Sequence, residues 1–248
     1  MRRLPSIMAA VLCTIAAAGG CSAPARCAGF QRLASLPAGD PITAEDLYPS
    51  RTAEWSYVVT AGTDAGDSIT HRRADTKRFD AMWVDHEDDR ISEFQRRDNH
   101  GNIVMPAVIS HRDHTISLFE PPLIIAYQAL PAGQPRRQEV AMRVVDLSDP
   151  AQLRESGRAV QTIEYVDDQR LRTPLGEFTA KRVIVTFNAD LQFAHAQTSS
   201  TLYVVPVLGA IVQQRREEVR ILGIPTRSRN QTLVLRSPSP AIASGDQR

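Results

Sequence analysis

The chain has few cysteines, and none of them lies in its main body. All three occur within the first 27 residues, so residues 28–248 contain none. A body without cysteine cannot form internal disulfides, a thiolate zinc site or a cysteine nucleophile. Lysine is also scarce, with Lys77 and Lys181 as the only two. Arginine therefore supplies nearly all of the positive charge.

Neither sign of charge is in excess. The formal net charge is +1, and without Arg2 and Arg3 near the start the chain carries 27 basic and 28 acidic residues. The arginines are scattered among acids, so we expect no basic surface for nucleic acid. The hydrophobic fraction of 42% is ordinary for a folded protein and argues against overall disorder.

Motifs of familiar catalytic sites are missing. The sequence has no Gly-x-Ser-x-Gly elbow, no Ser-x-x-Lys pair, no His-Glu-x-x-His and no phosphate-binding loop. Two carboxylate pairs, Asp167–Asp168 and Glu217–Glu218, consist of adjacent residues. Adjacent residues of a strand point to opposite faces, so neither pair forms a general acid–base pair by itself. We expect a protein that is not an enzyme and holds no cofactor.

Two groups of metal-ligating residue types occur, and neither has the pattern of a site. His111 and His114 flank a predicted turn, and their spacing on strands places them on opposite faces. The acidic segment 85–89 lacks the glycine and terminal glutamate of a calcium loop. We therefore expect no metal. An enzyme would become the better interpretation only if a polar cluster such as His86, Asp88 and His111 converged in a cleft.

The first 20 residues have the pattern of a secretory signal. Arg2 and Arg3 give a positive start, and residues 7–18 are apolar apart from Thr14. This stretch is shorter than the roughly 20 apolar residues that a transmembrane helix needs. The sequence therefore predicts export.

Residues 18–21, Ala-Gly-Gly-Cys, resemble the lipobox of bacterial lipoproteins, which is most often Leu-Ala-Gly-Cys. The resemblance implies that the bond between Gly20 and Cys21 is cleaved and that Cys21 is acylated, with palmitate among its lipids. Ala18 departs from the commonest pattern, and a conventional signal peptide with an incidental cysteine is the alternative. Ser22 is compatible, in Gram-negative lipoproteins, with passage to the outer membrane. We expect a lipid-anchored envelope protein that faces the periplasm.

The composition divides the rest of the chain. Residues 21–51 are rich in Ala, Pro, Gly and Ser, which predicts a flexible tether. Cys27 lies in it and could pair between molecules, stay a free thiol or carry a second lipid. Within the tether, Thr43 is a suitable cap for one helical turn ending at Leu47. Residues 52–236 form the predicted folded domain, and 237–248 a predicted disordered tail.

Alternation of apolar and polar residues predicts that the domain is built of strands. The expected strands cover residues 55–60, 69–74, 78–84, 90–97, 108–111, 115–119, 140–147, 159–166, 178–187, 199–205, 210–221 and 231–235. Turns are expected at 85–89, 99–102 and 112–114, and a short helix at 149–155. Long helical patterns between the strands are missing, which favours antiparallel pairing. The predicted fold is mostly β: a curved antiparallel sheet or half-open barrel with a short helix or two.

Two segments resemble a group of bacterial envelope proteins of unknown function. Residues 173–183, Thr-Pro-Leu-Gly-Glu-Phe-Thr-Ala-Lys-Arg-Val, resemble a hairpin of that group. Residues 203–212 resemble a later strand–turn–strand, without the tryptophan that follows its tyrosine. The resemblance covers about residues 159–235 and implies a curved sheet similar to the Lol-type lipoprotein carriers, whose concave face holds acyl chains. It brings no catalytic residue.

Two roles remain open for the anchored domain. In the first, the curved sheet binds a hydrophobic ligand, and the apolar segments 123–125 and 204–212 either line its cavity or belong to an ordinary core. In the second, the domain has a structural or assembly role and contacts another envelope protein. The sequence leaves the ligand, the protein partner and the oligomeric state undetermined.

Overall fold

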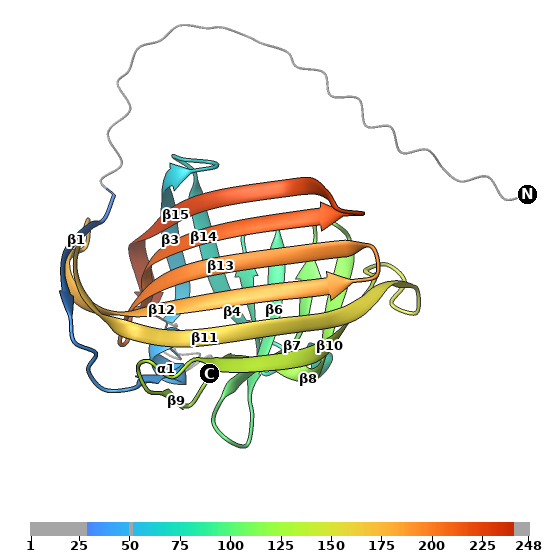
Figure 1. Ribbon diagram of the computed structural model, residues 1–248, viewed down its shortest axis with the longest axis horizontal. Coiled ribbons are helices and arrows are strands. Elements are labelled where there is room, and N and C mark those ends of the chain that lie inside the picture. Colours follow the sequence, from blue (N-terminus) through green and yellow to red (C-terminus); the bar gives the residue numbers. More distant parts are fainter. Residues whose placement is uncertain (1–28, 50–51, 241–248) are drawn as a thin grey trace, which may run out of the picture.

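The computed structural model of the protein describes residues 29–49 and 52–240, and nearly all of them lie in antiparallel β-strands (Figure 1). In chain order the elements are β1 (Gln31–Leu36), β2 (Ile42–Thr43), α1 (Ala44–Leu47), β3 (Thr52–Gly62), β4 (Ser68–Asp75), the 3-10 turn η1 (Arg78–Asp80), β5 (Trp83–Glu87), β6 (Ile91–Arg97), β7 (Ile103–Ser110), β8 (Thr115–Ala126), β9 (Ala129–Leu130), β10 (Arg136–Asp146), β11 (Leu153–Thr173), β12 (Gly176–Leu191), β13 (Ala194–Val205), β14 (Gly209–Ile221) and β15 (Ile224–Pro240). None of the described helices is long and apolar enough to cross a membrane.

Twelve of the described strands close into a barrel. The order runs from β3 through β8, then β10 to β15, and β15 pairs back with β3. Strand β1 is added outside this ring, where it pairs with the far end of β11. Figure 1 shows strands β11–β15 crossing in front of strands β4–β8 at a steep angle. The predicted mostly-β fold is confirmed, and the sheet closes completely, so that no strand of the ring keeps an open edge.

The antiparallel order gives the barrel two rims. One end carries the short turns after β3, β5, β7, β12 and β14 together with the β10–β11 loop, and we call it the hairpin rim. The helix rim is the opposite end, where α1 leads into β3. There, β2 pairs with β9 in the β8–β10 connection, and Glu45 of α1 contacts Arg97 at the end of β6, with 2.9 Å between Oε2 and Nη2. These contacts fix α1 against the helix rim.

The helix α1 begins as the sequence predicts. The Thr43 hydroxyl accepts a hydrogen bond from the backbone N–H of Asp46 (3.1 Å), and the Asp46 carboxylate accepts one from the N–H of Thr43 (2.9 Å). This reciprocal capping box satisfies two backbone donors that a helix start leaves free. Ala44 is buried, and Leu47 and the following Tyr48 point to the barrel interior.

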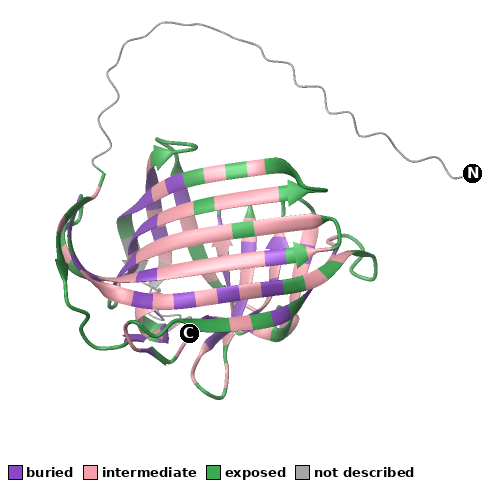
Figure 2. Cartoon of the chain, viewed as in Figure 1, coloured by how far each residue is buried: buried purple, intermediate pink, exposed green. Residues whose placement is uncertain are grey.

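Burial alternates along the strands, and Figure 2 shows this plainly on β11. Ala159, Gln161, Ile163 and Tyr165 are buried, while the residues between them are partly exposed. The period of two places the buried set inside the barrel. Outside β5–β8, a second apolar layer packs under η1, where the rings of Phe79 and Phe94 meet edge to face at 4.8 Å.

Three local predictions are wrong. Residues 78–84 do not form one strand, because Phe79 takes a left-handed backbone (φ 56°) in η1 and β5 begins at Trp83. Residues 85–87 belong to β5, and the turn lies after Glu87. Residues 149–155 form no helix, since β11 begins at Leu153. The turns at 99–102 and 112–114 are confirmed.

Part of the segment predicted as a tether is folded. Residues 31–36 pair with β11, and residues 42–47 form β2 and α1. Strand β15 likewise runs to Pro240, inside the predicted tail. The predicted signal, the cleavage site at Gly20, Cys21 and Cys27 lie outside the described residues, as does the end of the tail from residue 241.

Candidate functional site: a cavity inside the barrel

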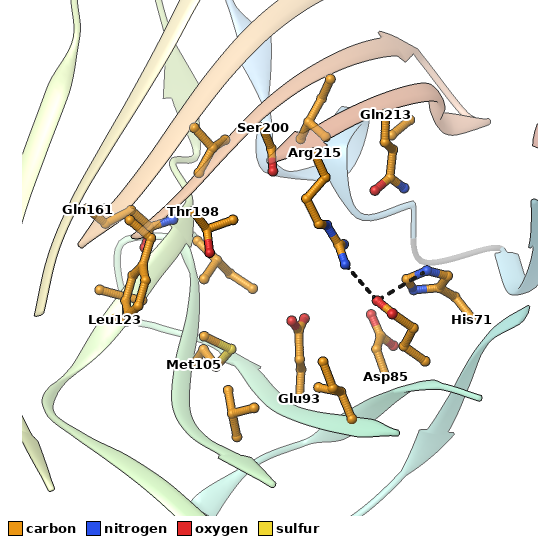
Figure 3. A pocket seen from close by; sticks show the side chains of 18 of the residues that line it. His71, Asp85, Glu93, Met105, Leu123, Gln161, Thr198, Ser200, Gln213 and Arg215 are labelled. Atoms are coloured by element: carbon orange, nitrogen blue, oxygen red, sulfur yellow. Dashed lines mark hydrogen bonds and ion pairs between the residues drawn. The ribbon is translucent and has the colours of Figure 1, made fainter. Parts of the chain in front are cut away.

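The barrel encloses a cavity of about 450 Å³. Its walls come from α1 and from strands of both the front and the back of the barrel, so the barrel's own side chains do not fill the interior. Volumes of roughly 300–1,000 Å³ are typical of small-molecule sites. The cavity is therefore the candidate binding site, and its two sides differ in chemistry (Figure 3).

One side of the cavity is apolar. Its side chains come from β7, β8, β10 and β12: Met105, Phe119, Leu123, Ile125, Met142 and Phe187. The rings of Phe119 and Phe187 meet edge to face, with 6.3 Å between their centroids. In the segment 123–125, Leu123 and Ile125 line the cavity. In the segment 204–212, Ala210 lines it, whereas Val204, Ile211 and Val212 are buried in the core clusters.

The opposite side of the cavity is charged, and one of its carboxylates, Asp85, forms an ion pair with Arg73. Asp85 of β5 lies between Arg73 of β4 and Glu93 of β6 in adjacent register. Arg73 donates two hydrogen bonds to Asp85, both 2.8 Å long. The guanidinium also lies 5.1 Å and 5.4 Å from the rings of Trp55 and Trp83. This bidentate pair fixes the position of Arg73, and the guanidinium balances the negative charge of Asp85.

A second ion pair crosses the interior. Arg215 of β14 donates to Glu87 of β5 at 3.0 Å, although three strands, β4, β3 and β15, lie between β5 and β14 in the sheet. Burial opposes the ionisation of Glu87, but Arg215 and His71 outweigh it and lower the pKa of the carboxyl to about 2. His71 lies 3.8 Å from Glu87. Burial lowers the pKa of His71 although Glu87 acts in the opposite direction, so the imidazole is neutral at pH 7.

Glu93 is the exception among these carboxylates. Within the described residues, no cation lies within 4 Å of it, and its carboxylate accepts a hydrogen bond only from the Gln95 amide, at 3.2 Å. Figure 3 shows the side chain extending into the cavity below Arg215. Burial and the neighbouring charge of Asp85 raise the pKa of Glu93 to about 7. At neutral pH the carboxyl is therefore poised between its two forms.

Several hydrogen-bonding atoms of the cavity wall are unused. Oε1 of Glu87 and Oε1 of Gln161 are buried without a hydrogen-bond partner among the described residues, as is Nε2 of His71. Both oxygens are acceptors, and both residues are only 6% exposed. A buried acceptor without a donor costs about 1–3 kcal/mol, so this wall of the barrel holds polar atoms at a cost to stability.

A charged side chain lies across the cavity toward the hairpin rim. Arg227 of β15 contacts Glu217, a lining residue of β14, at 3.4 Å. It also reaches Asp113 in the β7–β8 turn, on the opposite wall, at 3.3 Å. Both contacts are partly solvated, so they contribute little to stability. They place a polar bridge between the two walls.

His86, Asp88 and His111, whose convergence in a cleft would have favoured an enzyme, come together only in part. His86 and His111 both contact the Ser92 hydroxyl, each at 2.8 Å. This group lies on the outer face of the barrel, and Ser92 is 1% exposed, so no substrate reaches its hydroxyl. Asp88 instead accepts a hydrogen bond from the backbone of Thr70. His86, Asp88 and His111 therefore do not meet in a cleft.

The remaining predicted groups are separated. His114 lies in the β7–β8 turn, and no three potential metal ligands gather anywhere in residues 29–49 and 52–240. Glu217 lines the cavity, whereas Glu218 contacts Arg220 on β14. Asp167 pairs with Arg182 through two hydrogen bonds. The sequence analysis missed Glu93, Arg215 and Gln161. Their one signal in the sequence is that they are polar residues within segments that alternate like strands.

No relative emerges from comparison with known proteins. Neither a protein-family model, a curated protein nor a solved structure gives a significant match. The role of the chain therefore has to be argued from the chemistry of the cavity.

Proposed function

We propose that this protein is a lipid-anchored bacterial envelope protein that binds a hydrophobic ligand inside its barrel and catalyses no reaction. The observation that carries the proposal is the cavity of about 450 Å³ with one apolar side. A lipid on Cys21 would hold the barrel at the outer membrane, facing the periplasm, where apolar molecules need a protein to cross water. The Lol-type resemblance of residues 159–235 points the same way.

The apolar side supplies the free energy for binding. Burying apolar surface contributes about 25 cal/mol per Å², and the aromatic pair Phe119 and Phe187 offers a preformed surface for it. Water gains few hydrogen bonds against such a wall. A ligand with an apolar part displaces that water at little cost, because the closed barrel already holds the wall in place.

A binding role fits the polar side better than catalysis does. The hydroxyls of Thr198 and Ser200 line the cavity, and within the described residues no histidine or carboxylate is hydrogen-bonded to them. A hydroxyl without an adjacent base is a weak nucleophile. Asp85 and Glu87 are each held by a guanidinium, which favours positioning over proton transfer.

A pair of neighbouring serines on β13 gives a matched test of ligand binding. Ser200 lines the cavity, and Ser199 points to the opposite face of the strand. In the full-length protein, Ser200→Phe places an aromatic ring in the cavity and should weaken binding of the neutral fluorescent probe N-phenyl-1-naphthylamine by about tenfold or more. Ser199→Phe should leave it unchanged. The measurement is probe fluorescence after subtraction of the same detergent buffer without protein.

Two results would count against the proposal. The first is a wild-type protein that does not enhance probe fluorescence. The second is equal probe binding by wild type and Ser200→Phe, with circular dichroism showing that the variant is folded. In either case the cavity would not be a binding site.

The anchor has its own test at Cys21. Maturation of a lipoprotein needs a thiol to accept the diacylglycerol, and serine does not replace it in that pathway. Cys21→Ser should therefore abolish incorporation of a palmitate analogue in growing cells, whereas Cys27→Ser should keep it. Two or more chains make a stable anchor, because each buried CH₂ contributes about 0.8 kcal/mol. Label that persists in Cys21→Ser at the wild-type level would contradict the assignment.

An assembly role has one observation in its favour. Large apolar side chains are exposed on turns of the hairpin rim, with Phe193 at 50%, Leu222 at 73% and Ile224 at 66%. The N–H of Leu222 donates to the carbonyl of Phe193 at 2.8 Å, so the two turns form one exposed patch. Such patches are typical of contact sites. The candidate partner is another envelope protein that covers this rim.

A further inference from the structure

We propose that the ligand of the cavity is an amphiphile with a cationic amine head, bound with its ammonium group at Glu93 and its apolar part against Phe119 and Phe187. This inference rests on the proposed binding function and names the chemical class of the ligand. It follows from the charges, the unused hydrogen-bonding atoms and the arrangement of the cavity wall.

The charge of the wall lacks one cation. Four carboxylates line the cavity, and three of them have a guanidinium partner: Asp85 has Arg73, Glu87 has Arg215 and Glu217 has Arg227. Glu93 is the fourth, and among the described residues no guanidinium or ammonium lies within 4 Å of it. A bound ammonium would complete the pattern, whereas a carboxylate or phosphate head would lie beside a carboxyl group that has no ion-pair partner among the described residues.

The unused hydrogen-bonding atoms favour the same head group. Glu87 and Gln161 both line the cavity, and Oε1 of each is a buried acceptor without a donor among the described residues. Glu93 adds a carboxylate that accepts a hydrogen bond from Gln95 and from no other residue of the described chain. An ammonium carries three donors and no acceptor, so it matches a wall that offers acceptors. A head group rich in acceptors would leave these oxygens unpaired.

The arrangement of the wall sets the orientation of such a ligand. In Figure 3, Glu93 and Asp85 lie on one side of the cavity and Leu123 lies on the other, with Met105 between them. A molecule with its ammonium at Glu93 therefore has its apolar part directed toward β8 and β12.

Three probes with the same ten-carbon chain test the head group: decylamine, decan-1-ol and decanoate. Each is titrated against the full-length protein at pH 8, and displacement of N-phenyl-1-naphthylamine reports its affinity. Glu93→Gln keeps the shape of the side chain and removes the charge. Glu164→Gln removes a carboxylate from the outward-facing side of β11 and serves as the control. Detergent partitioning is the same for all variants, so each probe is compared across variants.

Of the three probes, only decylamine should lose affinity in Glu93→Gln. Glu93→Gln should weaken decylamine by about tenfold or more, change decan-1-ol by less than about twofold and leave decanoate equal or tighter. Glu164→Gln should change none of them. Two results would contradict the assignment of an amine head group: Glu93→Gln leaves decylamine affinity unchanged, or it weakens decylamine and decan-1-ol equally. In both cases the binding function itself still holds. If none of the three displaces the probe from wild type, the amine proposal fails, and the comparison of wild type with Ser200→Phe decides the binding function separately.

Discussion

Glu93 lowers the stability of the folded barrel when its carboxyl group is ionised. In the unfolded chain its carboxyl loses its proton near pH 4.5, and in the folded barrel near pH 7. The unfolded state therefore holds fewer protons between these values, and stability falls as the pH rises through this window. The loss at pH 8 is at most about 3 kcal/mol, because one pKa unit corresponds to about 1.4 kcal/mol and part of the side chain faces the cavity.

A substitution at this position should show the cost directly. Glu93→Gln should raise the free energy of unfolding at pH 8 by about 1–3 kcal/mol and leave it nearly unchanged at pH 4, where both states of the wild type are protonated. Urea unfolding at the two pH values measures this. A variant that is destabilised to the same extent at both pH values would show that Glu93 is an ordinary structural residue.

Glu87 is the counterpart of Glu93, because its pKa is shifted in the opposite direction. Its pKa of about 2 lies below the unfolded value of 4.5, so its contribution is present above pH 4.5 and is lost as the pH falls toward 2. Glu87→Gln should therefore lower the free energy of unfolding at pH 8 by about 3 kcal/mol, since it leaves Arg215 buried without its partner. The same urea titrations measure it. Equal effects of the two substitutions would contradict the assignment of their environments.

At the scale of elements, the short helix α1 depends on its cap. The capping box of Thr43 and Asp46 starts a helix of only four residues that holds Leu47 and Tyr48 against the cavity. Thr43→Ala should lower the free energy of unfolding by about 1 kcal/mol and speed hydrogen exchange at residues 44–48. Thr43→Ser keeps the hydroxyl and should behave as wild type. Unchanged exchange in Thr43→Ala would show that tertiary contacts alone hold the helix.

Elements were predictable where local chemistry decides them. The turn at residues 99–102 follows from asparagine and glycine, and α1 from its cap, and both are present. Residues 78–84 alternate like a strand, but Phe79 turns out of the pattern to pack on Phe94. Asp85 and Glu87 were predicted to lie in a turn because their cationic partners, Arg73 and Arg215, lie on other strands. Local patterns do not contain such contacts.

At the scale of the whole molecule, the closure of the barrel creates the site. Strand β15 pairs with β3, about the whole length of the domain away along the chain, and Arg215 meets Glu87 across 128 positions. Period-two patterns predict that strands exist and which face is buried, but not which strands join to close a ring. The sequence therefore predicted a curved β-sheet, and the cavity with Glu93 at its wall came only with the closed fold.

The most direct measurement is mass spectrometry of what the full-length protein carries after crosslinking in intact cells and purification from the envelope. We predict a small amphiphilic molecule, near one per chain, that is present with wild type and Ser199→Phe and missing from Ser200→Phe. A chain that carries no small molecule, and is instead crosslinked through the hairpin rim to one stoichiometric protein partner, would contradict ligand binding and establish an assembly role.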